Sequence, residues 1–158
     1  MRSQMKSFLK FALYLSIALN TTGVFAAGNS HHFPGVFVGY THAQSETEFT
    51  YGFEYEYKFN QSWGVGAIYE KVDDAHHGDG VSVKVAKLFY HPTSNLRFGI
   101  GFGEEKIGGY HPHTEDLYRI SASYEHHVGQ FGIAPTIAVD FIDGEEAYVF
   151  GIALVRPF

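Results

Sequence analysis

Aromatic and polar residues alternate strictly between Glu48 and Phe59. Every odd position of this stretch is Phe or Tyr, and every even position is Glu, Thr, Gly or Lys. Because successive side chains of a strand point to opposite faces, the stretch predicts a strand with one apolar and one charged face. Two surroundings fit such a strand: a soluble sheet with a protein core on the aromatic side, or a barrel wall with lipid on that side.

The two-residue period recurs along the rest of the chain, and no segment keeps a helical period of 3.6. Turn-forming residues separate the alternating segments. We therefore predict an all-β fold of eight strands, over residues 34–42, 48–59, 63–72, 81–91, 95–106, 115–127, 130–141 and 145–156.

The second face of these strands favours lipid over a soluble sheet. It consists of Gly, Ala, Ser and a few charged residues, as in the run Arg97, Gly99, Gly101 and Gly103. A soluble exterior would carry more Lys and Glu, whereas the interior of an eight-stranded barrel has room for small residues and a few long ones. The pattern predicts an eight-stranded antiparallel up-and-down transmembrane β-barrel. Pro135 falls on the lipid face, where we expect a local bulge.

The connections between the predicted strands alternate in character. Tight turns at Asn60–Ser62, Pro92–Ser94 and Val128–Gln130 alternate with slightly longer acidic, His-rich or Gly-rich connections at Ala43–Thr47, Asp73–Gly80, Ile107–Thr114 and Asp143–Glu145. Membrane barrels of this class have short periplasmic turns and longer outward loops. We expect the tight turns to face the periplasm and the acidic connections to face outward.

The N-terminus reads as a secretory signal peptide. Arg2, Lys6 and Lys10 precede or interrupt a short apolar run, and Val24 and Ala26 are small residues suited to a cleavage site. The run is too short for a membrane-spanning helix, which needs about 20 apolar residues. We predict a signal peptide over residues 1–26 and a barrel domain over 27–158.

Charge and cysteine content narrow the possibilities further. Without the three basic residues of the signal peptide, eight basic residues remain against 17 acidic ones, a net charge of −9 with His neutral. That balance argues against nucleic-acid binding, which needs Lys and Arg patches. The chain has no cysteine, so a small exported domain has no disulfide to stabilise it. A closed hydrogen-bonded barrel in a bilayer supplies stability in another way.

The whole pattern resembles the small outer-membrane β-barrels of the OmpA transmembrane-domain and OmpX type, within the porin-like proteins. The last strand carries an alternating apolar run and ends in an aromatic residue: Phe150, Ile152, Leu154 and Phe158. The resemblance implies that these residues form the signal read by the barrel-assembly machinery. It also implies export through the secretory pathway, a place in the Gram-negative outer membrane and contact with its lipid and lipopolysaccharide. Arg156 departs from the family pattern, which has an apolar residue there.

Charged residues on the inward face are expected to form a salt-bridged network that closes the lumen and sets the strand register. We expect Lys84, Arg97 and Arg119 to bridge carboxylates of neighbouring strands, since buried charges need partners. An alternative is a narrow channel, a gated polar path for protons or small ions. The predicted network consists of Glu54, Glu56, Lys58, Glu70, Lys84, Arg97, Glu105, Arg119, Glu125 and Asp140.

Histidines and carboxylates gather at the predicted outward connections. Imidazole with carboxylate is a ligand set for first-row transition metals, and carboxylates alone suit Ca²⁺ or Mg²⁺. The rim is either a solvated acidic surface or a divalent-cation site; no other cofactor is expected. The candidate ligands are Asp73, His76, His77, Asp79, His111 and His113.

An enzymatic alternative rests on Ser123, Glu125 and His127, which follow one another at every second position of one strand. A lipid A-modifying enzyme would need such a triad on the lipid side, whereas these residues are expected to face the lumen, about 7 Å apart along the strand. We therefore expect a non-enzymatic protein with a structural or envelope-integrity role. Cation binding at the mouth, a lipid A-modifying enzyme and a narrow channel remain the alternatives.

Overall fold

The computed structural model describes residues 30–73 and 80–158, all of them in strands and short connections. The predicted signal peptide, residues 1–26, lies outside these ranges. The strands are β1 (His32–Ala43), β2 (Glu46–Lys58), β3 (Trp63–Val72), β4 (Val81–Tyr90), β5 (Leu96–Ile107), β6 (His113–Tyr124), β7 (His126–Val128), β8 (Phe131–Ile142) and β9 (Glu145–Val155).

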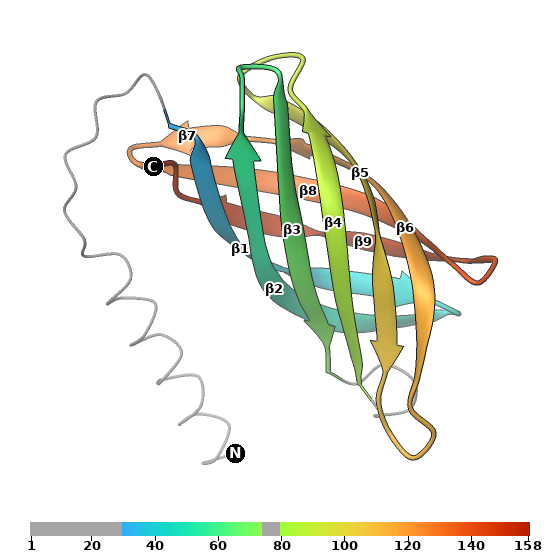
Figure 1. Ribbon diagram of the computed structural model, residues 1–158. Helices are drawn as coiled ribbons and strands as arrows, with labels where there is room; N and C mark the ends of the chain where they lie inside the picture. The colour runs from blue at the N-terminus through green and yellow to red at the C-terminus, as the bar shows by residue number, and fades with distance from the viewer. Residues whose placement is uncertain (1–29, 74–79) are drawn as a thin grey trace, which may run out of the picture.

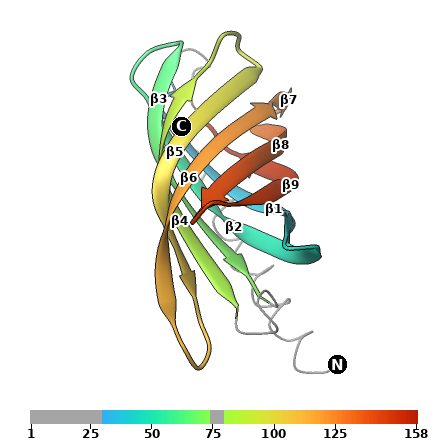
Figure 2. The same ribbon diagram turned by 90° about the vertical axis from the view of Figure 1, so that its right-hand side faces the viewer.

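Every strand pairs antiparallel with its neighbours, and the sheet closes on itself (Figures 1 and 2). Closure comes from the pairing of β1 with β9, where Val38 lies opposite Ile152, and from the pairing of β6 with β8. A closed sheet leaves no unpaired edge strand. The predicted all-β, eight-stranded antiparallel up-and-down barrel is confirmed.

The strands β6 and β7 are two parts of one barrel strand, interrupted beside Pro135. Ser123 pairs with Thr136 before the interruption, and His126 pairs with Ile133 after it. Both strands advance by three residues between these pairs, so neither carries an extra residue. The expected bulge at Pro135 is therefore wrong: proline has no N–H to donate, and the ladder breaks locally without changing register.

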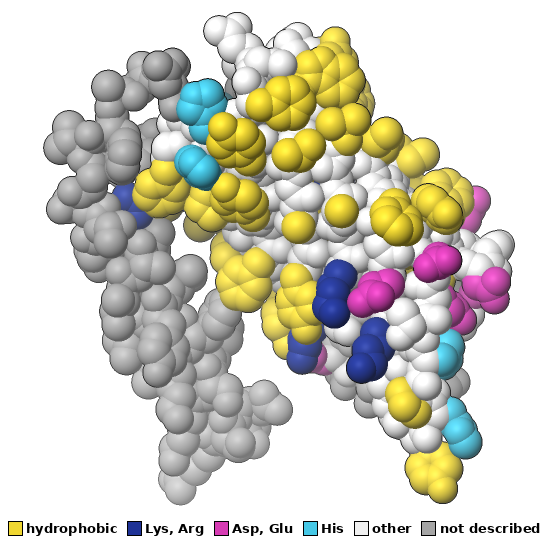
Figure 3. Space-filling view, viewed as in Figure 1, with side chains coloured by type: hydrophobic (Ala, Val, Ile, Leu, Met, Phe, Trp, Pro, Cys, Tyr) yellow, Lys and Arg dark blue, Asp and Glu magenta, His cyan; other side chains and the backbone are white. Residues whose placement is uncertain are grey.

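The barrel exterior is a wide apolar belt. The aromatic residues of the 48–59 stretch point outward, with Phe53 55% exposed, and Ile100, Phe102 and Ile137 on other strands are 60% exposed or more. Figure 3 shows the hydrophobic side chains gathered in a band across one face, with charged side chains beyond it. Apolar area this extensive suits hydrocarbon rather than water. Among the described residues, no helix is long and apolar enough to cross a membrane.

A charged rim marks where the belt stops. It consists of the outward-facing residues that follow the last apolar ones on five strands: Lys71, Lys84, Glu104, Asp116 and Glu146. Side chains beyond this rim stand outside the membrane-spanning part of the barrel. We call the end beyond it the loop end, and the opposite end, where His31 N–H bonds the Phe158 carbonyl at 3.0 Å, the turn end.

Two loop-end connections are tighter than the sequence suggested. The β1–β2 connection is a two-residue turn at Gln44 and Ser45, with φ of 49° and 70°, and the β8–β9 connection is a two-residue turn at Asp143 and Gly144, with φ of 46° and 83°. Paired positive φ values match the twist of a two-residue hairpin. The predicted connections, Ala43–Thr47 and Asp143–Glu145, were too long because β1 runs on to Ala43, β2 begins at Glu46 and β9 begins at Glu145.

Candidate functional site

The barrel interior holds a charged layer between the turn end and an apolar layer near the loop end. The apolar layer is a buried cluster over six strands: Val72, Val81, Val83, Val85, Ile107, Leu117, Ile142 and Ala147. A second buried cluster covers the interior of the β1, β8 and β9 wall, where Phe33 and Phe37 are its largest members. Two groups of ion pairs occupy the space that these apolar residues leave.

Arg119 is the centre of the first group. Its Nη2 donates to Glu70 Oε2 at 2.7 Å, and its Nε and Nη2 donate to the two carboxylate oxygens of Asp140 at 2.6 and 2.7 Å. Asp140 is its direct cross-strand neighbour, whereas Glu70 lies on β3, several strands away around the wall. All three side chains are at least 95% buried. The guanidinium therefore ties opposite sides of the barrel together through charge-assisted hydrogen bonds.

Arg97 is the centre of the second group, closer to the turn end. Its Nη1 and Nη2 each lie 3.0 Å from Glu54 Oε1, and Nη1 also donates to Glu56 Oε2 at 3.4 Å. Its Nε donates to the Ser123 hydroxyl at 3.0 Å. The other oxygen of Glu56 lies 2.6 Å from His91 Nε2, and both of these side chains are at least 97% buried.

Lys87 lies between the two groups and was not expected there. Its ammonium donates to the Ser121 hydroxyl at 2.5 Å and stands 4.8 Å above the Phe89 ring. Space for it comes from Gly99, where a Cβ atom would lie 2.8 Å from Lys87 Cε. Four buried carboxylates, Glu54, Glu56, Glu70 and Asp140, face the three basic side chains Arg97, Arg119 and Lys87.

The expectation for Lys84 is wrong. This side chain is 62% exposed on the outer surface, where it pairs with Glu104 at 3.3 Å. Strand β4 turns its odd positions inward, because Trp63 lies opposite Tyr90 and cross-strand neighbours share a face. Trp63 and Tyr90 are both aromatic and lie at the turn-end termini of neighbouring strands. Pairing them on one outward face was the signal that could have placed Lys87 inside instead.

Three predicted network residues lie near the ends of the network. Lys58 is partly buried above the Phe33 ring, with its ammonium 4.1 Å from the ring centroid. Glu125 lies at the β6–β7 interruption, and its buried Oε1 has no hydrogen bond but lies 3.0 Å from His127 Nε2. Glu105 lines a cavity at the loop end, where Ile107 of the apolar layer is its next inward-facing neighbour along β5.

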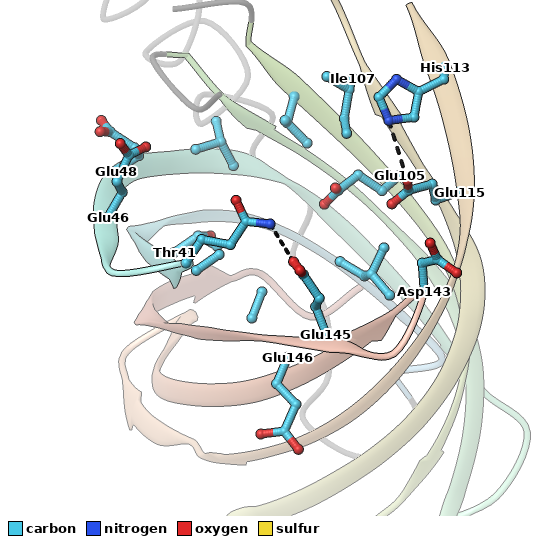
Figure 4. Close-up of a pocket in the computed structure, with 16 residues that line it drawn as sticks. Thr41, Glu46, Glu48, Glu105, Ile107, His113, Glu115, Asp143, Glu145 and Glu146 are labelled. Atoms are coloured by element: carbon cyan, nitrogen blue, oxygen red, sulfur yellow. Dashed lines mark hydrogen bonds and ion pairs between the residues drawn. The ribbon is translucent and has the colours of Figure 1, made fainter. Parts of the chain in front are cut away.

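This mouth cavity has a volume of 490 Å³ and is open to solvent (Figure 4). Residues of the apolar layer line one side of it, which we call its floor, and acidic residues line the rest, which we call its wall. The side chains around it are Thr41, Ala43, Gln44, Glu46, Glu48, Val72, Val81, Glu105, Ile107, His113, Glu115, Ile142, Asp143, Glu145, Glu146 and Ala147. Sequence reasoning placed acidic residues at this end but did not bring β1, β2, β5 and β6 together around one space.

Glu105 stands beyond the rim residue Glu104, outside the membrane-spanning segment. Burial raises the pKa of the Glu105 carboxyl to about 7, and the nearby carboxylates of Asp140 and Glu115 raise it in the same direction. A positive charge in the cavity would oppose this shift. The position therefore favours either a proton or a cation at neutral pH.

The predicted metal ligands are not gathered into a site within the described ranges. The Nδ1 atom of His113 lies 3.2 Å from the His111 carbonyl oxygen, and its Nε2 atom lies 3.3 Å from Glu115 Oε1. The Asp73 carboxylate accepts a hydrogen bond from the Tyr51 hydroxyl at 3.1 Å. Residues 30–73 and 80–158 contain no group of three His, Asp or Glu side chains placed to hold a metal ion. His76, His77 and Asp79 lie outside the described residues, so the metal site stays a prediction.

The predicted insertion signal occupies the closing strand. Phe150 and Ile152 are exposed in the apolar belt, and Leu154 is partly buried. Phe158 is held at the turn end, where its N–H donates to the His32 carbonyl at 2.8 Å. The alternating residues therefore lie on the strand that pairs with β1 to close the barrel.

No family model and no curated protein sequence matches the chain. Solved structures do. The N-terminal β-barrel domain of Pseudomonas aeruginosa OprF aligns with a TM-score of 0.65 at 11% identity, over 82% of this chain and all of that one. Neisserial surface protein A aligns with a TM-score of 0.60 at 7% identity, over 85% and 100%. Yersinia pestis Ail in a phospholipid nanodisc aligns with a TM-score of 0.55 at 12% identity, over 82% and 100%.

At these identities the likeness concerns the fold. The apolar belt of this chain independently supplies the surface that a bilayer requires. The apolar belt and the barrel fold of this chain both agree with the predicted localisation in the bacterial outer membrane. The resemblance predicted from the alternating strands is confirmed at this level: the chain has the fold of the small eight-stranded β-barrels of bacterial outer membranes.

Proposed function

We propose that the protein is a non-enzymatic outer-membrane barrel whose lumen is closed and whose role is structural, in support of envelope integrity. The buried network around Arg97 and Arg119 is the observation that carries this proposal. Its ion pairs cross the interior from β5 and β6 to β2 and β3. Beyond them, the buried side chains of the apolar layer occupy the lumen, which supports a sealed barrel over a narrow channel.

The surroundings of Ser123 support a role without catalysis. Its hydroxyl accepts a hydrogen bond from Arg97, and it is 6% exposed on the lumen side. The imidazole of His127 contacts Glu125 rather than Ser123 within the described residues. A nucleophile needs a base within hydrogen-bond reach, so the three residues do not make the relay that a lipid A-modifying enzyme would use.

A closed lumen predicts that the purified barrel does not conduct. In planar bilayers with about 1 M salt, about seven times physiological ionic strength, we expect no discrete current steps above the baseline. A large-pore porin reconstituted in the same way is the positive control. Reproducible single-channel steps that scale with protein concentration would overturn the closed lumen.

The envelope role is tested separately: cells that lack the protein should become more sensitive to anionic detergent, and wild-type protein should restore resistance.

The proposed partners are outer-membrane lipid with lipopolysaccharide and the barrel-assembly machinery. We expect Phe158→Ala to lower the amount of folded barrel in cells several-fold, while refolding into detergent micelles stays unchanged. The main-chain bonds of residue 158 to His31 and His32 do not need the ring, whose contact is the Arg156 guanidinium, 4.8 Å from its centroid. Comparing cells with micelles therefore separates recognition from stability. Heat-modifiable electrophoretic mobility measures both quantities. An equal loss in cells and in micelles would mean that the ring acts through stability, contrary to a recognition role.

A further inference from the structure

The mouth cavity combines an aliphatic surface with an acidic one, whereas a purely solvated rim would have only the acidic one. Its floor is aliphatic, built from buried residues such as Val81 and Ile107, while carboxylates stand around its wall. In Figure 4, the side chains of Glu105 and Glu145 project from strands on different sides of the space. Pockets with an apolar surface and a few convergent polar groups are the usual form of a small-molecule site.

The charged residues of the wall are almost all negative. Seven of the 16 lining residues are acidic, and none is Lys or Arg. Three carboxylates have local partners: Glu115 with His113, Glu145 with Gln44, and Glu146 with the Tyr148 hydroxyl. The other four, Glu46, Glu48, Glu105 and Asp143, make no hydrogen bond or ion pair with any described residue. The cavity therefore has unsatisfied acceptors distributed around it.

Glu105 is the most restricted of these four. Its side chain is half-buried between the apolar layer and the wall, with Asp140 below it and Glu115 beside it. Burial and like charge both disfavour its carboxylate. A bound cation would offset both costs, which gives this position a direct reason to take part in binding.

The shape of the cavity favours an organic cation over a metal ion. A metal ion needs several ligands converging at about 2.0–2.6 Å, and no such group exists among the described side chains. A metal ion would also leave the aliphatic floor and most of the 490 Å³ unused. Methylene groups would cover the floor, and separate ammonium groups would reach separate carboxylates.

We propose that the mouth cavity binds a linear aliphatic polyamine, with one ammonium at Glu105 and another at the carboxylates of the β1–β2 and β8–β9 turns. The alkyl chain lies over Val81 and Ile107. The proposal does not depend on whether the lumen conducts, since the cavity is at the loop end and shares no lining residue with the ion pairs around Arg97 and Arg119.

The test uses the full mature chain, refolded in zwitterionic micelles, with spermidine as the probe in isothermal titration calorimetry. We expect saturable binding of one spermidine per barrel. Glu105→Gln should weaken it about tenfold, the value of one charge-assisted hydrogen bond. Glu104→Gln is the matched control: it removes the same charge one residue away, but on the outer surface, where Glu104 pairs with Lys84. An equal loss in both variants, or no saturable binding, would overturn the proposal.

Two further measurements separate the amine from a general cation effect. Mg²⁺ should displace spermidine only at far higher concentration, and equal potency of the two would reduce the site to an acidic rim. Val81→Thr, which keeps the side-chain volume, should weaken spermidine binding through the floor and leave Mg²⁺ unaffected. Spermidine affinity should rise from pH 5 to pH 8 as Glu105 loses its proton, and this rise should disappear in Glu105→Gln. Near-UV circular dichroism establishes that each variant is folded.

Discussion

Replacing Arg119 by methionine is expected to lower the free energy of unfolding of the barrel by about 3–5 kcal/mol. The substitution keeps an unbranched side chain in the same space but leaves Glu70 and Asp140 buried without a cation. Both carboxylates are at least 95% buried, so water does not replace the lost hydrogen bonds. Urea unfolding in micelles, followed by tryptophan fluorescence of Trp63, measures the loss.

Two controls show that the loss comes from unpaired buried charge. Lys84→Met removes a cation of an exposed pair, 62% and 50% exposed, and should cost no more than about 1 kcal/mol. The triple variant Arg119→Met, Glu70→Gln and Asp140→Asn should recover much of the lost stability, because no charge is left without a partner. If Lys84→Met were as costly as Arg119→Met, the assignment of Lys84 to the surface would be wrong.

The alternating pattern sufficed for the fold because a strand has a fixed side-chain period of two. Once the aromatic positions of the 48–59 stretch were assigned to one face, the small residues and Glu54, Glu56 and Glu70 had to share the other. Strand β4 was harder, since both of its faces carry aliphatic residues and a lysine. Its phase depends on the register with β3, in which Trp63 lies opposite Tyr90.

The partners inside the barrel could not be predicted in the same way. The expectation was that arginines bridge neighbouring strands, which is correct for Arg119 and Asp140. Arg97 instead reaches Glu54 and Glu56, which are separated from it by more than 40 residues and lie on β2. Which residues meet across the interior depends on strand tilt and stagger, and these are properties of the closed barrel rather than of any one strand.

The mouth cavity shows the same limit of local reasoning. The acidic residues at the strand ends were visible in the sequence, but their arrangement around an apolar floor depends on Val72, Val81 and Ile107 facing inward at the same level. Short two-residue turns at Gln44–Ser45 and Asp143–Gly144 hold the wall close to the cavity. Longer loops would have placed the carboxylates farther from the floor.

Gly103→Ala is expected to destabilise the barrel by about 1–3 kcal/mol, the cost of forcing extra volume into a packed interior. In an ordinary strand this substitution would stabilise, because glycine loses more conformational freedom on folding than alanine. Here a Cβ atom at residue 103 would overlap the Lys84 carbonyl oxygen, so the backbones of β4 and β5 would have to separate. Gly35→Ala is the graded control: its nearest contact would be 3.0 Å, to the side chain of Glu54. Urea unfolding in micelles should therefore rank Gly103→Ala well below Gly35→Ala in stability. A Gly103→Ala barrel as stable as the wild type would mean that β4 and β5 do not approach as closely as described.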